Sequence, residues 1–168
     1  GGRSAAADEE SAISRLLLMN VGDSRALLIR RGVGVVKETS DHKPDHPVEL
    51  ARISASSGFV TQATPLDPAR VDGVLSVARA LGDFRWKGDT HLAPEAQRIS
   101  PLPDVYDLEV QGGDVVLLAC DGVFDVLSSS ETASVVLNSL GEGACRAQSA
   151  AQEAAEAVVR RALERGTG

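Results

Sequence analysis

Residues 115–122, with the sequence VVLLACDG, decide the fold of this chain. The apolar run Val115–Cys120 follows a Gly-Gly-Asp turn and ends at Asp121 and Gly122. An apolar run this short, closed by turn residues at both ends, predicts a strand that is buried on both faces. The next residue, Asp121, is therefore expected at the end of this strand, where the sheet edge holds its carboxylate in a fixed place.

Most of the other strands are expected in the first half of the chain. Three short apolar segments, residues 16–21, 25–30 and 33–36, are separated by turns that contain glycine, which predicts an antiparallel meander. Residues 74–78 predict a further short strand. Residues 104–110 alternate apolar and polar side chains, as an edge strand does.

Helices are expected at three places. A short helix can begin at Pro47, with Leu50 and Ile53 facing inward. Ser128 and Glu131 form a capping-box pattern at the start of a second helix.

The third helix is expected over residues 144–165, where apolar side chains recur at helical spacing. The residues of this stripe are Ala147, Ala151, Ala154, Val158 and Ala162. Strands therefore precede two consecutive helices at the end of the chain, which predicts an α+β fold with antiparallel sheets.

The composition limits the class of protein. The chain has 168 residues, of which 43% are hydrophobic and 24% charged, as expected for one soluble domain with a real core. A formal charge of -7 disfavours nucleic acid and anionic membranes as partners. No apolar segment approaches the roughly 18 residues of a membrane span. We expect a monomer.

Two further features concern the location and the boundaries of the domain. Cys120 and Cys145 are the only cysteines and form no Cys-x-x-Cys pair, which predicts reduced thiols and a cytoplasmic or nuclear location. Residues 1–14 are small, polar and acidic, and the chain begins without methionine. This segment is expected to be a flexible tail or the remnant of an insertion, and residues 15–168 to be part of a larger domain.

Several catalytic motifs are absent from the sequence. There is no G-x-x-x-x-G-K-[ST] loop, no G-x-G-x-x-G fingerprint and no G-x-S-x-G elbow. The acid that follows Asp121 is Asp125, four residues later. This spacing excludes a phosphatase with an aspartyl nucleophile, which needs its second acid two residues after the first.

Four segments together resemble a known family. In chain order they are residues 20–26 (NVGDSRA), 41–44 (DHKP), 73–83 (GVLSVARALGD) and 119–127 (ACDGVFDVL). Their order and spacing resemble the PP2C (PPM) family of metal-dependent protein serine/threonine phosphatases, from about residue 16 to residue 140. The resemblance implies part of an α/β/β/α sandwich, in which antiparallel sheets are flanked by helices. It also implies phosphorylated proteins as substrates.

The resemblance assigns roles to a few residues. Asp121 stands where the family has a ligand of a centre with two Mn²⁺ or Mg²⁺ ions, whose activated water attacks phosphoserine and phosphothreonine. Asp41, His42 and Lys43 resemble the flap that borders the cleft and shapes the choice of substrate. Asp83 is a candidate for supporting the metal ligands from behind, although an ordinary Gly-Asp turn explains it as well. No residue of this chain is assigned as catalytic.

Other family segments are not found in this sequence. Nothing like the Asp-Gly-His-Gly segment, which bridges both metals, precedes Leu16, and the upstream Glu-Asp pair and phosphate-binding arginine are missing too. Mn²⁺ and Mg²⁺ prefer six oxygen ligands, so Asp121 alone would hold an ion only weakly. We therefore expect little or no phosphatase activity from this chain by itself.

Simpler interpretations remain open for these residues. The whole protein could be a pseudophosphatase, which keeps the scaffold as a binding or regulatory module. Asp121 could be a turn aspartate that caps the following segment, and Asp125 is expected to make local hydrogen bonds. His42 and His46 are not expected to bind a metal, because Pro44 lies between them and breaks the helical register.

Overall fold

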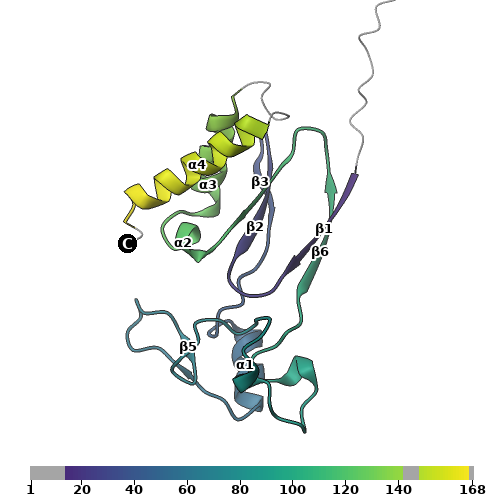
Figure 1. Cartoon of the computed structure of the whole chain (residues 1–168), viewed down its shortest axis with the longest axis vertical. Helices are drawn as coiled ribbons and strands as arrows, with labels where there is room; N and C mark the ends of the chain where they lie inside the picture. Colours follow the sequence, from purple (N-terminus) through teal and green to yellow (C-terminus); the bar gives the residue numbers. More distant parts are fainter. Residues whose placement is uncertain (1–13, 142–147, 167–168) are drawn as a thin grey trace, which may run out of the picture.

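The computed structural model describes residues 14–141 and 148–166 (Figure 1). The strands are β1 (Ser14–Asn20), β2 (Arg25–Arg30), β3 (Gly34–Glu38), β4 (Val60–Thr61), β5 (Arg70–Val71), β6 (Asp104–Val110) and β7 (Val115–Ala119). The α-helices are α1 (Pro47–Ala55), α2 (Asp121–Phe124), α3 (Ser129–Leu140) and α4 (Gln148–Glu164), with two 3₁₀ turns, η1 (Phe84–Trp86) and η2 (Pro94–Ala96). Antiparallel sheets and helices together confirm the α+β fold.

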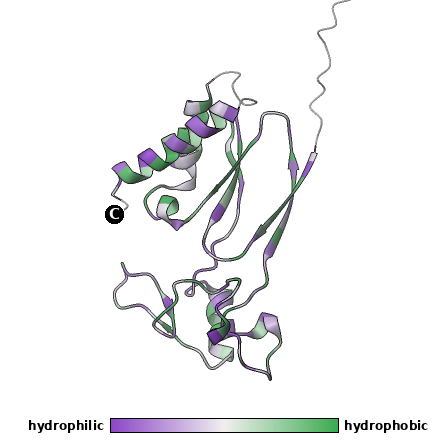
Figure 2. Ribbon diagram, in the orientation of Figure 1, coloured by the Kyte–Doolittle hydropathy of each residue, from purple (hydrophilic) through white to green (hydrophobic). Residues whose placement is uncertain are grey.

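The main core lies between one sheet and the C-terminal helices. The sheet has the strand order β3-β2-β7, and α3 and α4 cover one of its faces (Figure 1). Leu27 and Ile29 of β2 point into this core, where they meet Val136 of α3 and Val158 of α4. In Figure 2 helix α4 shows alternating hydrophobic and hydrophilic bands, as an amphipathic helix does.

The structure confirms one local prediction for the helices and contradicts another in part. The capping box at α3 is confirmed, because the Ser128 side chain accepts a hydrogen bond from the Glu131 backbone N–H and the Glu131 carboxylate accepts one from the Ser128 backbone N–H. In α4 the predicted stripe is wrong at Ala151, which is exposed; the buried residue is Ala150. Ala150 continues the four-residue spacing of the other buried residues, and Ala151 lies about 100° further around the helix. Ala147 lies outside the described residues.

The prediction that residues 115–120 are buried on both faces is wrong. Strand β7 ends at Ala119, and its burial alternates: Val116 is partly exposed and the Leu118 side chain is 72% exposed. The helices cover only the face that Leu117 shares with β2. The opposite face of β7 therefore presents apolar side chains to the surface.

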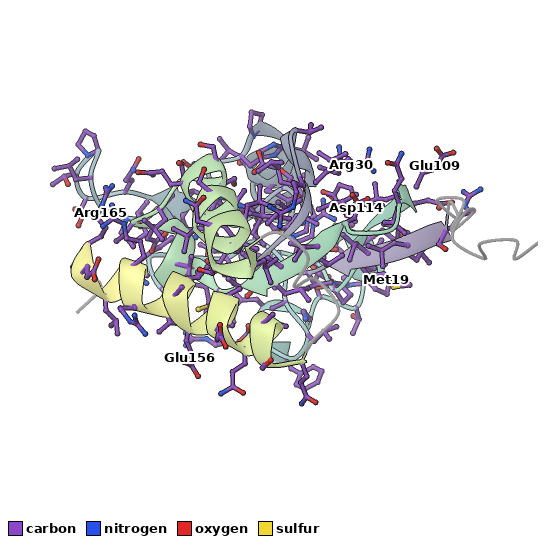
Figure 3. All side chains as sticks on the ribbon, turned by 90° about the horizontal axis from the view of Figure 1, so that it is seen from above. Met19, Arg30, Glu109, Asp114, Glu156 and Arg165 are labelled. Atoms are coloured by element: carbon purple, nitrogen blue, oxygen red, sulfur yellow. The ribbon has the colours of Figure 1, made fainter. Side chains whose placement is uncertain are left out.

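The predicted three-strand meander is also wrong in its pairing. Strand β1 pairs with β6 in a separate two-stranded sheet, with Met19 opposite Val105. Figure 3 shows Met19 at the outer side of this pair, and its side chain is exposed. A strand has only two edges, and both edges of β2 are taken by β3 and β7. The alternation of β6 is confirmed.

A second, smaller core lies around α1, below the main sheet in Figure 1. Ile53 of α1 packs there with Val71, Ala78 and Ile99. The prediction for Leu50 is wrong, because its side chain is 40% exposed. Residues 74–78 form no strand and make only one isolated bridge, from Leu75 to Val71. In the described part of the chain, no helix has both the length and the apolar character needed to cross a membrane.

Candidate functional site

Carboxylates gather in a groove at the start of α2. The groove has a volume of about 590 Å³, and its polar lining includes Lys43, Asp45, Asp67, Arg70, Asp121 and Asp125. These residues come from the loop before α1, from the β4–β5 hairpin, and from α2 and its C-cap residue Asp125. The groove therefore lies between the part of the molecule that contains the main core and the part around α1.

Asp121 is the first residue of α2, one position further from the sheet than the sequence predicted. Cys120 separates it from the end of β7 and adopts the extended backbone of an N-cap. The side chain of Asp121 is exposed, and its Oδ1 accepts a hydrogen bond of 2.8 Å from the backbone N–H of Gly122. Within residues 14–141 and 148–166, no ion pair involves this carboxylate.

Asp125 and Lys43 share the groove with Asp121. The backbone N–H of Asp125 donates to the Asp121 carbonyl at 2.8 Å, so both carboxylates belong to consecutive turns of the same segment. Lys43 Nζ lies 2.6 Å from Asp23 Oδ2. Partial burial alone would lower the pKa of Lys43. The hydrogen bond that Lys43 donates to Asp23 and the charges of Asp23, Asp125 and Asp41 outweigh this effect, so the pKa is raised and the ammonium group stays charged.

Asp41 forms an ion pair with an arginine and does not line the groove of Asp121. Arg25 binds both oxygens of Asp41 at 2.9 Å and also donates to Ser129 Oγ at 3.0 Å. Its guanidinium lies 4.6 Å from the centre of the Phe124 ring. The hydrogen bonds that Arg25 donates to Asp41 raise the pKa of Arg25. Asp41 lines an adjacent hollow of about 440 Å³, which shares Lys43 and Asp45 with the groove.

His42 is buried, with 3% of its side chain exposed. Its Nδ1 lies 3.1 Å from the backbone nitrogen of Gly22, and its Nε2 lies 3.3 Å from Asp104 Oδ2. Nδ1 also lies 3.1 Å from the carbonyl oxygen of Gly22, so it pairs with the Gly22 backbone in either tautomer, while Nε2 faces the Asp104 carboxylate. His42 therefore fixes the loop before α1 to the sheet, and it does not face the groove.

A buried ion network, which the sequence did not predict, lies behind this loop. The only signals in the sequence are Glu49 and Arg52, which follow residues 41–44 in the part that resembles the family, and Arg79 within residues 73–83. Glu49 is 1% exposed and binds Arg52 and Arg79, the latter at 2.6 Å. Burial alone would raise the pKa of Glu49, but the hydrogen bonds from Arg79 and Arg52 lower it below its ordinary value. Arg79 also binds Asp104 at 2.8 Å, which connects α1 with β6.

Asp83 does not line the groove of Asp121. It precedes η1 in a left-handed conformation (φ 50°), and its side chain does not cap that turn. A Gly82-Asp83 turn accounts for this geometry.

Among the described residues, no group of three or more His, Cys, Asp or Glu side chains could hold a metal ion. Asp121 could supply one carboxylate. Because Mn²⁺ and Mg²⁺ prefer six oxygen ligands, this part of the chain does not form a complete metal centre.

Comparison with solved structures gives the class of the protein. The fold matches the crystal structure of a phosphatase from Toxoplasma gondii with a TM-score of 0.78 and 32% identity, covering 91% of this chain and 44% of that one. The antiparallel sheets and the flanking helices are thus arranged as in that structure.

The family model described as Protein phosphatase 2C matches residues 6–168, and the chain belongs to this family. Protein phosphatase 2C homolog 2 of Schizosaccharomyces pombe is 42% identical over 118 residues, which are 70% of this chain and 30% of that protein. Protein phosphatase 1B of Mus musculus is 41% identical over 128 residues, which are 76% of this chain and 31% of that protein. The chain thus spans less than a third of the length of these relatives.

Proposed function

We propose that the whole protein to which this chain belongs is a protein serine/threonine phosphatase that hydrolyses phosphoserine and phosphothreonine in proteins. In this proposal Asp121 contributes one carboxylate to a centre of two Mn²⁺ or Mg²⁺ ions. The observation that carries the proposal is the place of Asp121, whose exposed side chain lies at the groove. Among the described residues, the hydrogen bond from Gly122 is the only polar contact of this carboxylate, so its oxygens can take a further ligand.

Neighbouring residues support this role for Asp121. Arg25 and Lys43 hold Asp41 and Asp23, so these two carboxylates are already neutralised. Arg70 adds positive charge to the wall of the groove, where it can attract a phosphate group.

The complete centre needs ligands beyond the described residues. When bound, the ions would supply an activated water and would neutralise charge on the phosphoryl oxygens. Because Asp121 is a single carboxylate, we propose that this chain alone has little or no activity. No covalent phosphoenzyme is expected.

The experiment compares the full-length protein with its Asp121→Asn variant in the hydrolysis of p-nitrophenyl phosphate with Mn²⁺. We expect the variant to lose most of the Mn²⁺-dependent rate. Asp107→Asn is the matched control, because Asp107 is an aspartate of β6 that does not line the groove, and it should keep the wild-type rate. Equal rates for wild type and Asp121→Asn would remove Asp121 from the mechanism.

A pseudophosphatase is the second candidate, and the lack of a metal-binding cluster among the described residues favours it. Such a protein would bind phosphoproteins without hydrolysing them. The sequence that flanks this chain in the full open reading frame discriminates between the two. An upstream Asp-Gly-His-Gly segment, together with the downstream Asp-Asn pair that usually follows the last helix in the family, favours the enzyme. Intact flanks without them favour the binding module.

We further propose a cytoplasmic or nuclear monomer. The free thiol of Cys120, which is exposed, supports a reducing compartment. Size-exclusion chromatography with light scattering of the full-length protein tests the oligomeric state.

A further inference from the structure

A second hollow lies beside η1 and shares no lining residue with the groove of Asp121. Its volume is about 260 Å³, and its lining includes Arg85, Trp86, Asp89, Leu92 and Arg98. Two guanidinium groups and an indole thus meet in one hollow of a chain whose formal charge is -7.

Asp72 holds two walls of this hollow in place. Its Oδ2 accepts hydrogen bonds from Trp86 Nε1 at 3.2 Å and from Arg98 Nη1 at 2.7 Å. Arg98 also donates to the Ser56 carbonyl at 3.1 Å. The indole and the Arg98 guanidinium are therefore already positioned before any ligand arrives, which lowers the entropy cost of binding.

Arg85 differs from Arg98 because its charge is not neutralised. It is exposed, and its guanidinium lies 5.2 Å from the centre of the Trp86 ring. In the part of the chain that the structure describes, no hydrogen bond or ion pair involves Arg85. The contact with the indole restrains the guanidinium, while its N–H donors stay available.

We propose that this hollow binds a carboxylate side chain from an acidic segment of a partner protein. The planar guanidinium of Arg85 can bind both oxygens of one carboxylate. Trp86 and Leu92 offer apolar surface to the methylene groups of a glutamate. Asp89 lies in the same lining and disfavours a doubly charged phosphate. Arg85, which has no ion pair among the described residues, matches the single charge of a carboxylate.

The test uses the full-length protein and a fluorescein-labelled peptide, GEELEG, with fluorescence anisotropy at low and at physiological salt. The matched probe is the peptide GQQLQG, which has the same length without the charges. We expect Arg85→Gln to weaken binding of the acidic peptide about tenfold or more, because a charge-assisted bidentate pair is lost. Arg85→Lys, which keeps the charge but loses the planar fork, should give a smaller loss.

Arg160→Gln is the control, since Arg160 is an exposed arginine of α4 outside the hollow. It should bind the acidic peptide as the wild type does. Because Arg85 is exposed and makes no ion pair in the described chain, its substitution should leave the circular dichroism spectrum unchanged. Three results would overturn the proposal: no binding of GEELEG, equal binding of GQQLQG, or an equal loss in the Arg160 variant. Tighter binding of the corresponding phosphoserine peptide than of GEELEG would overturn the assignment to a carboxylate.

Discussion

Replacement of Glu49 by glutamine tests whether the buried ion network holds α1 against the rest of the protein. Glutamine keeps the shape and one oxygen acceptor but removes the negative charge. Arg52 then loses its only carboxylate in the described chain, and Arg79 keeps only Asp104, at 2.8 Å. The side chains of both arginines are 14% exposed, so their uncompensated charges are poorly solvated.

The magnitude follows from burial. Removing one partner of a buried ion pair costs about 3–5 kcal/mol. We expect the lower end, about 3 kcal/mol, because Glu49→Gln keeps a hydrogen-bond acceptor and Arg79 keeps a partner. The assay is urea unfolding of the protein, followed by circular dichroism, with the free energy of unfolding taken from linear extrapolation.

The matched control is Asp107→Asn, which removes an ion pair with Arg15 on the surface of β1 and β6. Both side chains are well exposed, so water and salt screen the pair, and its loss should change the free energy of unfolding little. If Glu49→Gln costs no more than Asp107→Asn, the network does not stabilise the fold and the reasoning is refuted.

Three further predictions test separate features. Folding lowers the pKa of Glu49, so the ionised carboxylate stabilises the folded protein above its ordinary pKa, and this stabilisation is lost as the pH falls through the lowered pKa. The free energy of unfolding should therefore depend less steeply on pH in the acid range for Glu49→Gln than for the wild type. Ser128→Ala should lower the free energy of unfolding by about 1 kcal/mol, since it removes the cap of α3, and an unchanged urea midpoint would contradict this role. Leu118 is exposed on an apolar face, so Leu118→Asp should leave the isolated chain folded and reduce the fluorescence of the bound dye ANS. A loss of structure in the circular dichroism spectrum would show instead that this face is covered.

Local patterns predicted the elements whose cause lies within one segment. The capping box at Ser128 and Glu131 sets the start of α3, and the alternation of residues 104–110 identifies β6. The apolar run before Asp121 predicted β7, because a short apolar segment between two turns has few alternatives. The resemblance through four separated segments gave the correct family.

Errors arose where distant segments decide the outcome. Alternation and turns could not show that β1 pairs with β6 instead of with its neighbour β2. The paired residues Asn20 and Asp104 are 84 residues apart in the sequence. The sequence also suggested Leu50 for the core of α1, whereas Glu49 is the buried residue. Its burial depends on two arginines, one of which, Arg79, lies 30 residues further along the chain.

The candidate site shows the same division. The sequence by itself determined the α+β class, the family and the place of Asp121 just after an apolar strand. Only the tertiary structure decided that Asp41 contacts Arg25 and that His42 contacts Asp104. It also decided that Lys43 and Asp125 line the same groove as Asp121. A local pattern reports the preferences of neighbouring residues, whereas these contacts exist only after loop closure and packing bring separate segments together.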